Sequence, residues 1–177
     1  MKLFKKLAAA ALAAVLALSM VGCGAGGTGS ALDLKNEVLN YIDDEYYMSG
    51  KTATHKTAMD AAAAKLIENA AADEAAKDEN VTVKALLEKQ TIEGEGGYIA
   101  IFAPYTQLRT EFMQYSYIQQ MYDALYAVTN GWGSHDEMIV KIGNPAVGVG
   151  NSIEMGAATG TIKGKNYLVL LVQNAKA

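Results

Sequence analysis

The run from Tyr167 to Gln173, which reads YLVLLVQ, most constrains the fold of this 177-residue chain. A strand with one solvated face alternates apolar and polar residues, whereas a nearly continuous apolar run has to be covered on both faces. Gly164-Lys165 precedes the run as a natural hairpin turn, so a strand over Ala157 to Ile162 is expected to pair with it. The sequence therefore predicts a central strand within a covered sheet.

Apolar residues recur with the helical period in the first half of the chain. Ser49-Gly50 ends the first predicted helix, and Thr57 with Asp60 fits a capping pair for the second, which is rich in alanine. A third, shorter helix is predicted from Thr82 through Leu87. These helices precede a strand over Tyr98 to Phe102.

The helical period returns between Leu108 and Val128, after which the chain reads as β. A strand over Ala146 to Gly150 is expected before the two strands of the hairpin. This order predicts an α+β fold, in which helices pack on a small antiparallel sheet that ends in a C-terminal β-meander.

The N-terminal residues predict export and lipid anchoring. Lys2, Lys5 and Lys6 precede an apolar run that is shorter than the about 18–20 residues a membrane-spanning helix needs. Cys23 follows a small residue, as in a bacterial lipobox, so residues 1–22 are predicted to be a lipoprotein signal peptide and Cys23 the acylated N-terminus. The alternative is an ordinary signal peptide with a spare cysteine.

Lipidation of Cys23 would place the rest of the chain at a membrane surface. Residues 23–30 are predicted to form a flexible tether, and residues 31–177 a single domain at the outer face of the bacterial cytoplasmic membrane. The membrane is thus one expected partner, because two or more acyl chains hold a protein stably at a bilayer.

The composition excludes sites that need cysteine, and it argues against one class of partner. Cys23 is the only cysteine, so the domain has no disulfide, no thiolate metal site and no cysteine nucleophile. Residues 23–177 contain 12 basic and 19 acidic residues, a net charge of about −7. This acidity argues against nucleic acid as a partner.

The last quarter of the chain resembles the CAP superfamily, which comprises cysteine-rich secretory proteins, antigen 5 and pathogenesis-related proteins. The family signature is a serine-containing turn and a histidine, an aliphatic residue four positions on, an Asn-Pro turn, a Val-Gly-Val-Gly strand and a final hairpin ending in Val-Gln. The matching residues are Ser134, His135, Ile139, Asn144-Pro145, Val147, Gly148, Val149, Gly150, Tyr167 and Gln173. The resemblance implies an α-β-α sandwich, often secreted or lipid-anchored in bacteria.

The resemblance also implies a cleft, which in some family members binds a divalent metal through two histidines and two acids. Only His135 falls on a matching histidine position, and Glu95 could stand for one of the acids. Ser134 and Glu137 complete the candidate cleft residues, and His55 is a weaker candidate for a further ligand. A zinc site generally needs three or four placed ligands, so the alternative for His135 is a solvated turn. Ser134 and His135 are adjacent, which does not fit a catalytic triad.

Six tyrosines crowd between residues 98 and 126. Exposed tyrosines at this density can form a glycan- or peptide-binding surface, because the ring supplies contact area and the hydroxyl supplies direction. The alternative is that Tyr122 and Tyr126 face the core from one side of a helix.

The expected function is a non-enzymatic binding or interaction module of the bacterial cell envelope, built on a degenerate CAP-like domain. One alternative is a metal-dependent hydrolase that acts on an envelope polymer or peptide, with His135 and Glu95 in its cleft. Another is a small-ligand-binding lipoprotein of unrelated fold.

Overall fold

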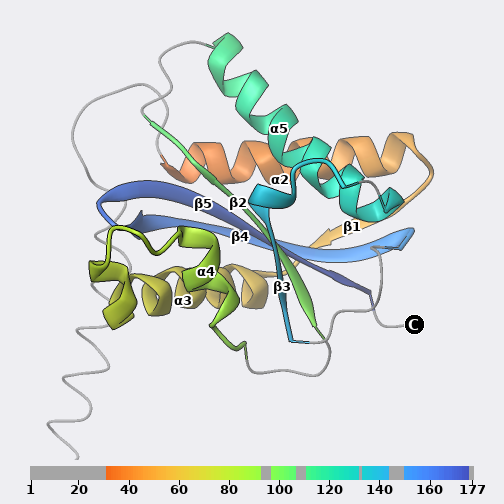
Figure 1. Ribbon diagram of the computed structural model, residues 1–177. Coiled ribbons are helices and arrows are strands. Elements are labelled where there is room, and N and C mark those ends of the chain that lie inside the picture. The colour runs from red at the N-terminus through yellow and green to blue at the C-terminus, as the bar shows by residue number, and fades with distance from the viewer. Residues whose placement is uncertain (1–30, 93–96, 107–110, 132, 144–149, 176–177) are drawn as a thin grey trace, which may run out of the picture.

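The computed structural model describes residues 31–92, 97–106, 111–131, 133–143 and 150–175, which form three layers (Figure 1). Two helices, α2 (Ala31–Met48) and α5 (Glu111–Asn130), cover one face of a five-stranded sheet. The other face is covered by α3 (Thr57–Ala72) and α4 (Val83–Glu88). The predicted α+β fold, with helices packed on a sheet, is confirmed. The predicted signal peptide and tether lie outside the described residues.

The sheet has the strand order β1-β4-β5-β2-β3. Its strands are β1 (Thr52–His55), β2 (Tyr98–Pro104), β3 (Ile139–Ile142), β4 (Ser152–Ile162) and β5 (Lys165–Asn174). β5 is central, as the apolar run predicts, and it pairs antiparallel with β4 and with β2.

The turn between β4 and β5 consists of Lys163 and Gly164, one position earlier than predicted. Both residues have positive φ, at 51° and 74°, which is the backbone of a tight two-residue hairpin.

Two features of the sheet differ from the antiparallel meander expected from the sequence. β1 pairs parallel to β4, with Ala53 opposite Ile153, so the sheet is mixed. β3 pairs with β2 at the far side of β5, and it is separated in sequence from the C-terminal hairpin. Of the strand expected over Ala146 to Gly150, residues 146–149 lie outside the described residues and Gly150 belongs to no strand.

Residues of β5 contribute alternately to two hydrophobic cores. Leu168, Leu170 and Val172 pack toward α2 and α5, whereas Val169 and Leu171 pack toward α3 and α4. All five side chains are fully buried. The continuous apolar run therefore reflects helices on both faces of the sheet.

Glycines in β4 let α3 approach the sheet closely. A Cβ atom at Gly156 would lie 2.6 Å from the backbone of Met59 and Asp60, and one at Gly160 would lie 2.7 Å from the Ile67 side chain. The helix begins after Lys56 without a side-chain cap, so the expected capping pair of Thr57 and Asp60 is wrong. The Asp60 carboxylate is used elsewhere.

None of the described helices combines the length and the apolar character needed to cross a bilayer.

Candidate functional site

The residues predicted around His135 lie in a turn between α5 and β3. His135 is half-buried and has a left-handed backbone, with φ of 65°, and the short 3-10 turn Asp136–Met138 follows it. The Lys84 side chain of α4 donates a hydrogen bond of 2.6 Å to the Asp136 carbonyl. This bond connects the turn to the helical layer formed by α3 and α4. Ser134 and Glu137 are exposed.

A metal site is not assembled within the described part of the chain, where no group of three or more histidine, cysteine, aspartate or glutamate side chains gathers. Glu95, the acid expected to join His135, lies outside the described residues. His55, the weaker candidate ligand, sits at the end of β1 and binds Asp60 instead. The structure does not bring His55 and His135 into one metal site.

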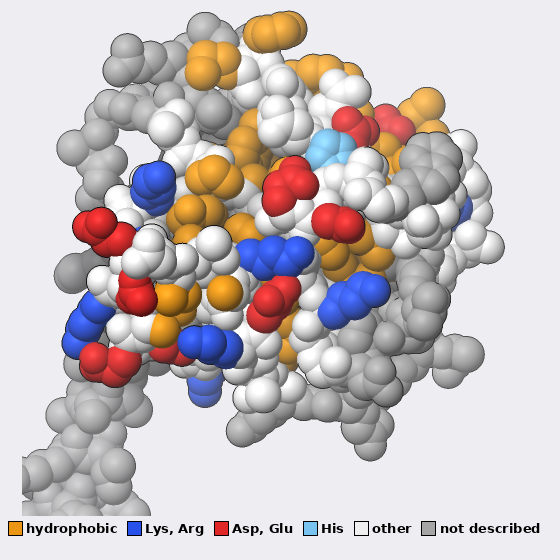
Figure 2. Space-filling view, in the orientation of Figure 1, with side chains coloured by type: hydrophobic (Ala, Val, Ile, Leu, Met, Phe, Trp, Pro, Cys, Tyr) orange, Lys and Arg blue, Asp and Glu red, His pale blue; other side chains and the backbone are white. Residues whose placement is uncertain are grey.

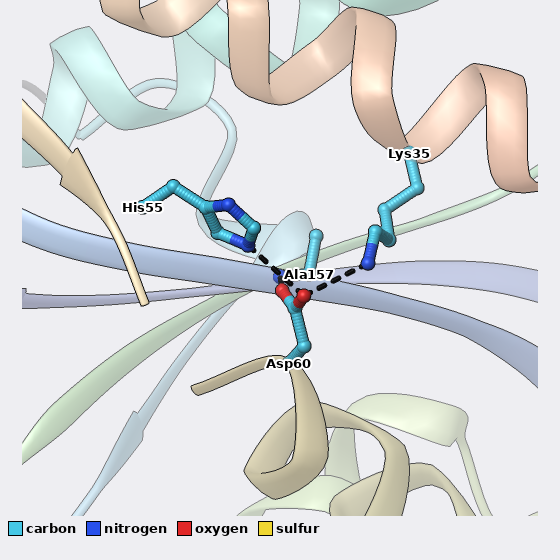
Figure 3. A network of polar contacts seen from close by, with 4 residues as sticks. All are labelled: Lys35, His55, Asp60 and Ala157. Atoms are coloured by element: carbon cyan, nitrogen blue, oxygen red, sulfur yellow. Dashed lines mark hydrogen bonds and ion pairs between the residues drawn. The ribbon is translucent and has the colours of Figure 1, made fainter. Parts of the chain in front are cut away.

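A polar network centred on Asp60 joins four elements (Figure 3). One carboxylate oxygen accepts hydrogen bonds from Lys35 Nζ at 2.8 Å and interacts with His55 Nε2 at 2.9 Å. The other accepts the backbone N–H of Ala157 at 2.8 Å. These residues come from α2, β1, α3 and β4, so Asp60 links both helical layers to the edge of the sheet.

The end of β1 explains why Asp60 takes this position. The last pair of the parallel ladder is His55 with Met155, so β4 has no strand partner on this side at Ala157. The Asp60 carboxylate accepts the hydrogen that a neighbouring strand would otherwise accept. Burial raises the pKa of Asp60, but the hydrogen bonds from Lys35, Ala157 and His55 outweigh it and hold the pKa below its usual value.

The network orients His55. Its members are a lysine, a histidine, an aspartate and a backbone amide, and none of them is a hydroxyl or thiol nucleophile. Its contacts hold α2 and α3 to the edge of the sheet formed by β1 and β4. Sequence reasoning missed Lys35 and gave Asp60 a different role, because only the fold brings these residues together.

A second feature is the outer face of the α2–α5 layer, hereafter the α2–α5 face. All six large hydrophobic side chains that are exposed in the described residues lie on these two helices. They are Tyr47, Met48, Phe112, Met113, Tyr115 and Tyr126, and the most exposed are Tyr47 at 82% and Met48 and Phe112 at 80% each.

A row of aromatic rings follows the seam between the helices. Tyr41 of α2 makes edge-on contacts with Tyr115 and Tyr122 of α5, at centroid distances of 6.1 and 5.7 Å. Tyr126 continues the row at 6.2 Å from Tyr122. Tyr117, by contrast, is buried and donates a hydrogen bond to the Ala103 carbonyl.

The exposure that a tyrosine surface requires is found at only some of these positions. Tyr115 and Tyr126 are exposed and Tyr122 is half-buried. Orientation toward the core, the alternative for Tyr122 and Tyr126, is wrong for Tyr126.

Carboxylates flank this row. Glu37 and Glu45 stand one helical turn on either side of Tyr41, and the Gln114 side chain of α5 donates a hydrogen bond to Glu37. Burial raises the pKa values of Tyr41 and Tyr122, and the charge of Glu45 raises both further. Both hydroxyls therefore stay protonated beside the carboxylates.

Comparisons with protein-family models, with curated proteins and with solved structures found no match.

Proposed function

We propose that this chain is a lipid-anchored interaction module of the bacterial cell envelope that docks a protein partner on its α2–α5 face. The observation that carries the proposal is the location of the exposed large hydrophobic side chains, all of which lie on α2 and α5 among the described residues. Phe112, Met113 and Tyr115 lie near the start of α5, and Tyr47 and Met48 lie at the end of α2, so exposed apolar side chains occur along this one layer, and larger exposed apolar patches mark interaction sites.

The predicted lipid anchor at Cys23 supports a position of the α2–α5 face near the membrane. A tether over residues 23–30 spans at most about 28 Å when fully extended. It leads directly into α2, which begins at Ala31. The α2–α5 face would therefore operate close to the membrane, where other envelope proteins are concentrated.

The resemblance to the CAP superfamily remains part of the proposal. In this interpretation, the turn around His135 keeps the family position without supplying an enzyme's full set of ligands. The exposed tyrosines of α5 take over the role of the binding surface.

Site-specific photo-crosslinking in intact cells tests the proposal. A photoreactive residue at position 112, replacing Phe112, is expected to give a discrete adduct of higher mass. The same residue at position 65, replacing the exposed Lys65 of α3 on the opposite layer, serves as the matched control. Adducts of equal yield from both positions, or no adduct from position 112, would contradict docking on the α2–α5 face.

A further inference from the structure

We propose that the segment docked on the α2–α5 face is cationic, namely a lysine- or arginine-rich stretch of a protein or peptide. This inference rests on the proposed function and specifies the chemistry of the partner.

The acidic excess of the domain is concentrated in the α2–α5 layer. The two helices contain seven acidic residues and one basic residue, Lys35. The rest of residues 23–177 contains 12 acidic and 11 basic residues and is nearly neutral. On the opposite layer, around η1 (Glu74–Lys77) and α4, basic and acidic side chains are interspersed (Figure 2).

The one basic side chain of these helices does not neutralise the face. Lys35 passes the end of β1 and pairs with Asp60 of the opposite layer. The other ion pairs in the described part of the chain involve residues of β1–α3, η1, α4 and β4, and none uses an acid of α2 or α5. Asp43, Asp44 and Asp123 are exposed, and Glu37 accepts a hydrogen bond only from the neutral Gln114 side chain among the described contacts, so these carboxylates keep their charge for a partner's cations.

The two helices also direct their negative ends to the same end of the layer. Contacts advance together along both helices, from Glu37 with Gln114 to Tyr41 with Tyr122, so the helices run in the same direction. The C-terminal end of a helix carries a partial negative charge that favours nearby cations. Neither last turn contains a basic residue, and Asp43, Asp44 and Glu45 add charge near the end of α2.

Aromatic rings between carboxylates suit a cation better than a neutral ligand. Lysine and arginine side chains bind the faces of tyrosine rings, and their charge is then balanced by neighbouring acids. The chain itself already provides an example at the end of α2, where Lys51 Nζ lies 5.7 Å from the centre of the Tyr46 ring. A second copy of this chain is a poor occupant, because two faces of the same negative charge repel each other.

The test measures fluorescence anisotropy of a rhodamine-labelled peptide of alternating arginine and glycine, titrated with full-length protein in detergent. Peptides with glutamate or with serine in place of arginine are the controls. Saturable binding is expected for the arginine peptide alone. Raising the salt from about 0.01 M to about 0.15 M shortens the screening length from about 30 Å to about 8 Å, and should weaken this binding.

Isosteric variants localise the binding. Glu45→Gln is expected to weaken it about two- to fivefold, and Glu37→Gln with Glu45→Gln about tenfold. Glu68→Gln on the exposed side of α3 is the matched control and should leave it unchanged. Urea midpoints of all variants report whether the fold is intact.

The outcomes separate this inference from the proposed function. Equal binding of the arginine, glutamate and serine peptides, or arginine binding that ignores salt and Glu45, would overturn the cationic partner. Docking on the α2–α5 face would then stand on the photo-crosslinking result alone. Absence of arginine-peptide binding together with a position-112 adduct overturns only the cationic inference, and absence of both overturns both proposals.

Discussion

At the scale of single residues, the Asp60 carboxylate joins α3 to α2, β1 and β4 through three interactions. The carboxylate is half-buried, and it accepts hydrogen bonds from Lys35 and the Ala157 amide and interacts with His55. Loss of the negative charge leaves Lys35 without its ion-pair partner and replaces hydrogen bonds to a charged acceptor by weaker ones.

We predict that Asp60→Asn lowers the free energy of unfolding by about 1–3 kcal/mol at pH 7. The folded-state pKa of Asp60 is depressed, so its contribution is fully present above the unfolded-state pKa and is lost as the pH falls through the folded-state value. The difference between wild type and variant should therefore shrink at about pH 3. Urea denaturation at both pH values measures it, with Glu68→Gln as a control. An equal difference at both pH values would refute the electrostatic explanation.

At the scale of elements, the contact between α3 and β4 depends on the absence of side chains at Gly156 and Gly160. Gly156 faces the helix backbone, which cannot move without shifting α3, whereas Gly160 faces the Cγ2 methyl group of the Ile67 side chain, which can move by a change of rotamer. The two positions therefore differ in how much an added methyl group costs.

We predict that Gly156→Ala lowers the free energy of unfolding by about 1–3 kcal/mol, and Gly160→Ala by less. Gly133→Ala is the control, because the nearest atom to a Cβ there is 3.8 Å away. Urea midpoints rank the three variants, and a midpoint for Gly156→Ala equal to that of Gly133→Ala would show that α3 does not depend on this close approach.

The elements that the sequence predicts are those with local signals. The apolar run of β5 and the helical periods predict the central strand and the helices, because these patterns depend on neighbours in sequence. β1 carries little signal: it is four residues long and buries only Ala53. Its parallel pairing depends on β4, about a hundred positions later in the chain.

The candidate sites also differ in whether they depend on residues that are near or distant in sequence. The polar turn at His135 and the tyrosine density of α5 can be read from the sequence. The Asp60 network cannot, because Lys35 lies 25 positions and Ala157 97 positions from Asp60. The acidity of the chain is also visible in its composition, but its concentration in one layer requires knowledge of which helices share a face.

At the scale of the whole molecule, the interaction and hydrolase interpretations make opposite predictions for zinc. We predict that calorimetric titration of zinc into the wild-type protein and into His135→Ala gives equally weak heats. The reason is that His135 sits in a turn whose neighbours Ser134 and Glu137 are exposed, with no group of three potential ligands in the described residues. Micromolar or tighter binding that His135→Ala abolishes would favour the metal-dependent hydrolase instead.

The strand order also determines when the molecule can fold. β4 and β5 occupy the middle of the sheet, yet they are the last strands in the sequence. A chain that emerges from its N-terminus first exposes α2, α3 and α5 before the surface that buries them has been made. Pairing of β1 with β4 closes a loop of about a hundred residues, a contact that forms slowly. The sheet is therefore completed only when the C-terminal hairpin of β4 and β5 has formed between β1 and β2.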